Sequence, residues 1–200
     1  MRLRLHHFLP HSHANGPGVR AVVWVQGCSL ACPGCFNPDT HSPRGGRLVE
    51  VGELVEQIAG LGETIEGITV SGGEPLQQRP AVTELLRRVK SETALSVILF
   101  TGFSWAEVLR LVPPLADTPT HRYLGSRSIP ELLDYVDVLI AGRYDQSRHL
   151  ARGLRGSSNK TVHFLTDRYT LDDLESVPAA EVVVTTTGDV LCSGIEPVNL

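Results

Sequence analysis

The chain has 200 residues, of which 42% are hydrophobic and 20% are charged. This length and composition predict a single globular domain and exclude a disordered chain. The 18 basic and 22 acidic residues give a formal net charge of −4, which disfavours general nucleic-acid binding. No segment reaches the roughly 18 apolar residues of a membrane span, and no signal-peptide pattern follows the N-terminus. We therefore expect a cytoplasmic protein without membrane or direct nucleic-acid partners.

Short apolar runs alternate with helical patterns along the chain, which predicts βα units and a parallel sheet. The predicted strands cover residues 19–26, 65–70, 95–100, 136–141 and 161–165. The predicted helices cover residues 48–61, 80–90, 104–111, 129–134 and 171–177. Residues 113–128 and the polar stretch 143–160 are expected to be loops. A turn at residues 187–189 predicts a terminal β-hairpin.

Three of the four cysteines lie close together, with the spacing C-x3-C-x2-C at Cys28, Cys32 and Cys35. Three thiolates on one loop can hold three irons of a cubane cluster and leave the fourth iron open. A structural zinc site normally needs four ligands, so His41 or Cys192 would have to complete it. A closed four-cysteine cluster would also need Cys192. The pattern favours the open cluster, with both alternatives remaining.

Residues suited to a site follow three of the predicted strands. Cys28 follows the first strand, Ser71–Gly73 follow the second and Thr101–Gly102 follow the third. Because parallel α/β folds place their sites at the carboxyl ends of the strands, we expect these residues to share one site.

Four segments resemble motifs of the radical S-adenosylmethionine (radical SAM) superfamily, and within it the glycyl-radical-enzyme activating proteins. They are residues 15–20 (NGPGVR), 27–37 (GCSLACPGCFN), 71–76 (SGGEPL) and 155–159 (RGSSN). The resemblance covers residues 15–165 and is nearest to the activators of anaerobic ribonucleotide reductase. The cysteine loop and the Gly-Gly-Glu-Pro segment, about 36 residues apart, together make it specific.

The resemblance implies an α/β fold, namely a partial open (βα)6 TIM-like barrel, and the hairpin predicted above would follow it as a C-terminal extension. Residues 1–165 would form the radical SAM core, and residues 166–200 would extend the same domain. It further implies a [4Fe-4S] cluster with one open iron, which binds S-adenosylmethionine. The cluster ligands would be Cys28, Cys32 and Cys35, and the residues near S-adenosylmethionine would be Phe36, Gly72, Gly73, Glu74, Thr101 and Gly102.

The implied reaction is reductive cleavage of S-adenosylmethionine to methionine and a 5′-deoxyadenosyl radical. That radical would abstract hydrogen from a glycine Cα of a partner such as anaerobic ribonucleotide reductase, with a flavodoxin or ferredoxin as electron donor. One alternative is a radical SAM enzyme that modifies another polypeptide or a small molecule. A less favoured alternative is a non-catalytic iron–sulfur or zinc module.

Some residues depart from the family pattern or lie outside it. Gly34 precedes the third cysteine where the superfamily often has an aromatic residue, and Lys160 stands where glutamine is familiar. Arg20 and Arg143 are further candidates for the region near the cofactor carboxylate. Cys192 is expected to be a small buried residue of the hairpin.

Overall fold

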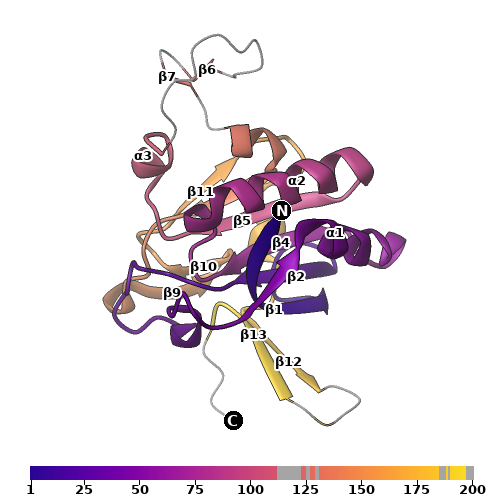
Figure 1. Cartoon of the computed structure of the whole chain (residues 1–200). Coiled ribbons are helices and arrows are strands. Elements are labelled where there is room, and N and C mark those ends of the chain that lie inside the picture. Colours follow the sequence, from indigo (N-terminus) through magenta and orange to yellow (C-terminus); the bar gives the residue numbers. More distant parts are fainter. Residues whose placement is uncertain (112–122, 125–126, 129–130, 185–187, 189, 197–200) are drawn as a thin grey trace.

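A seven-stranded sheet with the order β11-β8-β5-β4-β2-β1-β3 forms the centre of the protein (Figure 1). The computed structural model describes residues 1–111, 123–124, 127–128, 131–184, 188 and 190–196. The sheet strands are β1 (Arg2–Ser12), β2 (Arg20–Val25), β3 (Arg47–Glu50), β4 (Gly67–Gly72), β5 (Ser96–Thr101), β8 (Val138–Ala141) and β11 (Thr161–Phe164). The central strands β2, β4, β5 and β8 are parallel, and β1, β3 and β11 are antiparallel to their neighbours. The fold is therefore α/β with a mostly parallel central sheet.

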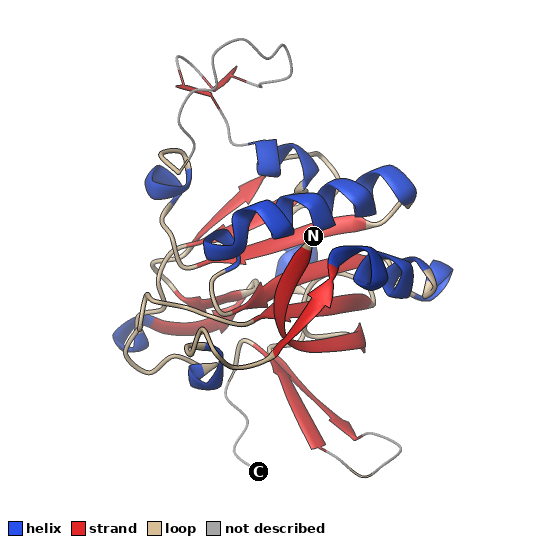
Figure 2. Cartoon of the chain, viewed as in Figure 1, coloured by secondary structure: helices blue, strands red, loops and turns tan. Residues whose placement is uncertain are grey.

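Helices α1 and α2 lie together on one face of the sheet (Figure 2). The α-helices are α1 (Val51–Ala59), α2 (Arg79–Glu92), α3 (Trp105–Val108) and α4 (Leu171–Glu175). The 3₁₀ helices are η1 (Pro38–Thr40), η2 (Gly62–Thr64), η3 (Pro75–Gln78), η4 (Glu131–Tyr135) and η5 (Gln146–Arg148). Strands outside the main sheet are β6 (Tyr123–Leu124), β7 (Arg127–Ser128), β9 (His149–Arg152), β10 (Arg155–Ser157), β12 (Ala180–Val184) and β13 (Val190–Gly194). Among the described residues, no helix has the length and apolar character needed to cross a bilayer.

The alternation of side chains along each strand separates the core from the site. Val23 and Val70 belong to the core cluster that includes residues of α1 and α2. Their neighbours Trp24 and Ser71 point to the other face, because successive strand residues face opposite ways. Helix α2 completes the core with an apolar stripe at helical spacing, which consists of Val82, Leu85, Leu86 and Val89.

Several elements differ from the sequence-based expectation. The helix expected over residues 48–61 begins only at Val51, because Arg47–Glu50 pair with β1 as a strand. Strand β1 itself was not expected, and the polar stretch 143–160 contains the β9–β10 pair in place of a loop. The loop expected over residues 113–128 and the turn over residues 187–189 lie largely outside the described residues.

The buried carboxylate of Asp137 stabilises the sheet at the amino ends of β5 and β8. Asp137 accepts hydrogen bonds from the backbone N–H of Val97 (2.7 Å), from Lys90 Nζ (2.9 Å) and from Thr166 Oγ1 (2.9 Å). Burial by itself would raise the pKa of Asp137, but these hydrogen bonds outweigh it and hold the pKa below its ordinary value.

We therefore expect Asp137→Asn to lower the free energy of unfolding at pH 7 by about 2 kcal/mol, because it leaves Lys90 without its charged partner. A lowered pKa means that the carboxylate contributes stability above a pH of about 4 and loses it as the pH falls further. Urea denaturation at pH 7 and pH 3 measures this. A difference between variant and wild type that is as large at pH 3 as at pH 7 would contradict the assignment.

Candidate functional site

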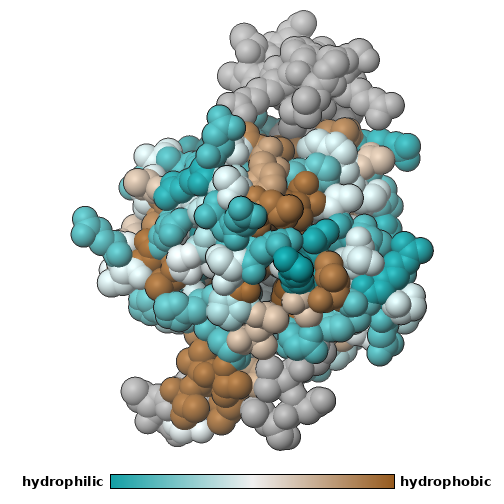
Figure 3. All heavy atoms as spheres, turned by 180° about the vertical axis from the view of Figure 1, so that it is seen from behind, coloured by the Kyte–Doolittle hydropathy of each residue, from teal (hydrophilic) through white to brown (hydrophobic). Residues whose placement is uncertain are grey.

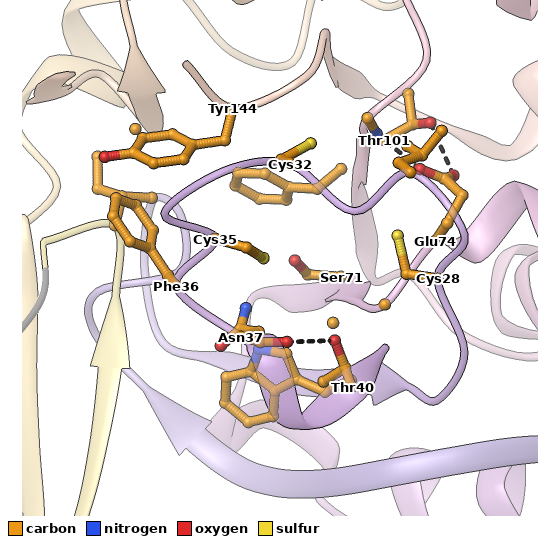
Figure 4. Close-up of a pocket in the computed structure, with 18 of the residues that line it drawn as sticks. Cys28, Cys32, Cys35, Phe36, Asn37, Thr40, Ser71, Glu74, Thr101 and Tyr144 are labelled. Atoms are coloured by element: carbon orange, nitrogen blue, oxygen red, sulfur yellow. Dashed lines mark hydrogen bonds between the residues drawn. The ribbon is translucent and has the colours of Figure 1, made fainter. Parts of the chain in front are cut away.

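The carboxyl ends of β2, β4 and β5 meet at one open cavity. All the residues that the sequence analysis assigned to the cluster and to S-adenosylmethionine line it: Cys28, Cys32, Cys35, Phe36, Gly72, Gly73, Glu74, Thr101 and Gly102. The loop that bears the cysteines curls around the cavity, with Cys28 and Cys35 on either side of Ser71 (Figure 4). Strand topology thus brings together residues that are up to 74 positions apart in the chain.

Backbone hydrogen bonds shape the cysteine loop. Gly27, with a φ of 100°, turns the chain out of β2, and its N–H donates to the Thr40 carbonyl (2.7 Å). Cys35 N–H donates to the Cys32 carbonyl (3.2 Å), which closes a tight turn. Gly34 inside that turn has a φ of 70°, a left-handed conformation that favours glycine. This geometry explains why glycine replaces the aromatic residue expected before the third cysteine.

The three cysteines are free thiols, and each is partly buried. Burial raises the pKa of the Cys28 and Cys35 thiols, which disfavours their thiolates in the absence of a cation. A bound metal reverses that preference, because it stabilises the coordinating thiolate.

The segment Gly72–Glu74 crosses the start of the cysteine loop at very short range. Gly73 N–H donates to the Val25 carbonyl (2.7 Å), and Glu74 N–H donates to the Gly27 carbonyl (2.9 Å). A Cβ atom on Gly73 would lie 2.4 Å from the carbonyl oxygen of Gly27. Glycine is therefore required here by contact with backbone atoms that have little room to move.

Glu74 is fully buried and ties the end of β4 to the end of β5. Its carboxylate accepts hydrogen bonds from Leu76 N–H (2.9 Å), Thr101 Oγ1 (2.8 Å) and Gly102 N–H (2.7 Å). Burial raises the pKa of Glu74, although these hydrogen bonds oppose the shift. The side chain accordingly fixes the loop, and Thr101 and Gly102 hold it in place.

Two arginines that were candidates for the cofactor carboxylate have other partners. Arg20 is fully buried at the amino ends of the strands, where it donates to Thr69 Oγ1 (2.8 Å) and Ser96 Oγ (2.9 Å). It therefore lies at the opposite end of the sheet from the cavity, which corrects the expectation. Arg143 forms an ion pair with Glu107 (2.7 Å).

The cation that lines the cavity is Lys160, which the sequence analysis noted only as a departure from the family pattern. Its Nζ donates to the Gly142 carbonyl. Burial lowers the pKa of Lys160, whereas the charges of Cys32, Glu74 and Cys35 raise it. Lys160 thus places positive charge beside the thiols and the Gly-Gly-Glu loop.

An aromatic group forms another part of the cavity wall. Phe36 contacts Tyr144, with ring centroids 4.4 Å apart, and meets His149 edge to face at 5.8 Å. Gly156 leaves room for this packing, because a Cβ there would lie 2.8 Å from Phe36. Tyr144 and His149 were missed by the sequence analysis, which singled out only Arg143, residues 155–159 and Lys160 in their segment.

The donor set fits an iron–sulfur cluster. Among the described residues, no three His, Cys, Asp or Glu side chains lie close enough to hold a single metal ion. The three thiols surround one cavity, as ligands to a larger group would. The glycine-lined loop opposite them lets a ligand approach backbone carbonyls closely.

Comparison with known proteins agrees with this geometry. The family model of a 4Fe-4S single cluster domain matches residues 14–163. The anaerobic ribonucleoside-triphosphate reductase-activating protein of Enterobacteria phage T4 is 32% identical, over 79% of this chain and 92% of its own length. The corresponding protein of Vibrio cholerae serotype O1 is also 32% identical, over 82% and 99%.

More distant likenesses were found as well. The pyruvate formate-lyase 1-activating enzyme of Escherichia coli K12 is 28% identical over 80% of this chain and 60% of its own length. The solved structure of QueE from Escherichia coli has a TM-score of 0.44 and 13% identity, and the match covers 68% of each chain.

The site and the family match define an enzyme of the radical SAM type, with a [4Fe-4S] cluster and S-adenosylmethionine as cofactors. More narrowly, the chain belongs to the family of anaerobic ribonucleoside-triphosphate reductase-activating proteins.

We expect Gly73→Ala to lower the free energy of unfolding by about 1–3 kcal/mol, the usual cost of overpacking, because its Cβ would collide with the Gly27 carbonyl. Gly52→Ala in α1 is the matched control, since its Cβ would meet only the flexible end of the Arg88 side chain of α2. Urea denaturation of both variants measures the difference. Equal stability of the two variants would refute the close crossing.

Proposed function

We propose that this protein installs a glycyl radical on an anaerobic ribonucleoside-triphosphate reductase, with a flavodoxin or ferredoxin as electron donor. The observation that carries the proposal is the meeting of three thiols from one loop with the Gly72–Glu74 segment in one open cavity. The chain's membership in the family of activating proteins named above also supports the proposal. We also infer that the parallel run β2-β4-β5-β8 belongs to a partial (βα)6 barrel with the β12–β13 hairpin as its extension.

In this proposal Cys28, Cys32 and Cys35 bind three irons, and the fourth iron binds S-adenosylmethionine. When bound and reduced, the cluster supplies the electron that cleaves S-adenosylmethionine to methionine and a 5′-deoxyadenosyl radical. The carbonyls of Gly72 and Gly73 accept hydrogen bonds from the methionine ammonium group. Phe36 packs beside the cofactor and shields it from water.

Thr101 and Gly102 contribute in two ways. They hold Glu74 through hydrogen bonds, and they line the wall of the cavity next to it. We place the ribose or adenine of S-adenosylmethionine against this wall. The buried carboxylate of Glu74 then positions the loop without contacting the reacting atoms.

Removing any of the three clustered cysteines tests the cluster assignment. We expect Cys28→Ala, Cys32→Ala and Cys35→Ala each to lower 5′-deoxyadenosine formation at least 100-fold. Each variant lacks one thiolate ligand of the cluster, and the cluster supplies the electron for the cleavage. Cys192→Ala is the matched control and keeps full activity. The assay uses anaerobically reconstituted protein with dithionite and S-adenosylmethionine.

The outcomes of this assay distinguish the proposed function from the alternative interpretations of the cysteine site and of the substrate. Loss of the cluster in Cys192→Ala would show a closed four-cysteine site. Zinc in place of iron after reconstitution would indicate a non-catalytic module. Product formation without a glycyl radical on the reductase, observed by electron paramagnetic resonance, would indicate another polypeptide or a small molecule as substrate.

We further propose that Lys160 binds the carboxylate of S-adenosylmethionine. Lys160→Gln should raise the dissociation constant of S-adenosylmethionine about tenfold, since a hydrogen bond to a charged group contributes roughly 1.5–3 kcal/mol. Arg143→Gln, which removes a cation paired with Glu107, should leave it unchanged. Equilibrium dialysis against the oxidised holoenzyme, which cannot cleave the ligand, measures both. Equal affinities in Lys160→Gln and wild type would exclude this role.

A further inference from the structure

The C-terminal part of the chain lies beyond the region that the family shares. The family match ends at residue 163, and α4, β12 and β13 follow it. The phage T4 and Vibrio cholerae relatives are matched over 92% and 99% of their length, yet they match 79% and 82% of this chain. About a fifth of this chain therefore lies outside each of these two matches.

This additional segment reaches the cofactor cavity. Gly194 and Ile195 line that cavity beside the cysteine loop. Strand β13 also lines a second open cavity, together with His6 and His7 of β1. The two cavities share Trp24, Phe36, Asn37 and Gly194. The second cavity therefore adjoins the first, and strand β13 forms one of its walls. We call this second cavity the antechamber.

Polar contacts fix the hairpin β12–β13 to the body of the protein. Glu181 accepts hydrogen bonds from the hydroxyl of Ser12 and from the N–H of His13 (2.8 Å). Ser193 accepts a hydrogen bond from the Asn15 amide. Just after β13, Glu196 pairs with His149 (2.7 Å), the residue that contacts Phe36. These contacts hold the hairpin in a fixed position against the body of the protein, next to the wall of the cofactor cavity.

One face of the hairpin is apolar and exposed within the part of the chain that the structure describes. Val182 pairs with Cys192 and Val184 pairs with Val190, so these four side chains share one face. Val182 is 47% exposed, Val184 is 66% exposed and Val190 is 52% exposed. Cys192 is exposed as well. The expectation of a buried Cys192 is thus wrong, because Cys192 is exposed at the border of the second cavity. Figure 3 shows this hydrophobic patch at the lower end of the molecule.

We propose that the hairpin β12–β13 docks the glycyl radical enzyme, and that the antechamber admits its glycine-bearing segment to the cofactor. This inference rests on the proposed function. A polypeptide substrate must hold one Cα at the cofactor, so it needs a surface beside the cavity that fixes its position. The valine face lies on an element that borders both cavities, and clustered exposed apolar side chains typically mark protein-binding surfaces. The partner would present an apolar surface next to its glycine loop.

The test uses the double variant Val182→Thr/Val190→Thr of the full-length enzyme, which keeps side-chain shape at two exposed positions. The ligand is purified anaerobic ribonucleoside-triphosphate reductase from the same source. We expect its dissociation constant to rise at least tenfold, while 5′-deoxyadenosine formation with dithionite and without the reductase stays at the wild-type rate. Leu171→Thr, on α4 and 45% exposed, is the control and should match wild type in both.

The outcomes distinguish this inference from the proposed function. Unchanged reductase affinity in the double variant would overturn the docking role and leave the proposed function intact. Failure of the wild type to bind the reductase would overturn both. A wild-type dimer that the double variant converts to monomer would show a self-association surface, and would likewise overturn the docking role.

Discussion

The site depends on one close contact between two loops. The carbonyl of Gly27 accepts the N–H of Glu74, and the absence of a side chain on Gly73 lets the two backbones approach. This contact places the cysteine loop opposite the Gly-Gly-Glu segment. The buried carboxylate of Glu74 then fixes the distance to β5 through Thr101 and Gly102. A radical reaction needs its cofactor held in one orientation, and this network supplies a rigid support for it.

The sequence predicted much of the site because its motifs coincide with strand ends. The strands around Val23 and Leu99 are apolar on both faces, and the strand around Val70 is a short run rich in β-branched residues, so all three are easily recognised as buried parallel strands. Because these strands are parallel, Cys28, Gly72 and Thr101 at their carboxyl ends lie at the same edge of the sheet. Ser104 and Glu107 form a capping box at the start of α3, and the spacing of these two residue types is a purely local feature of the sequence.

Other features could not be predicted because they depend on contacts between distant segments. Strand β1 alternates Leu3 and Leu5 with arginines, a pattern too short to distinguish from a polar terminus without its partner β3. The role of Lys160 depends on burial next to Cys32 and Cys35, and the sequence shows neither distance nor burial. Cys192 is exposed at the border of the second cavity, and nothing in its local sequence encodes this position.

The central claim is that one iron of the cluster is open and binds S-adenosylmethionine. The most direct measurement is the electron paramagnetic resonance spectrum of the reduced wild-type cluster, recorded before and after addition of S-adenosylmethionine. The account predicts a changed spectrum, because the ligand coordinates the iron that Cys28, Cys32 and Cys35 leave free. Identical spectra, from protein with a fully assembled cluster, would show that all four irons already have protein ligands and would contradict the account.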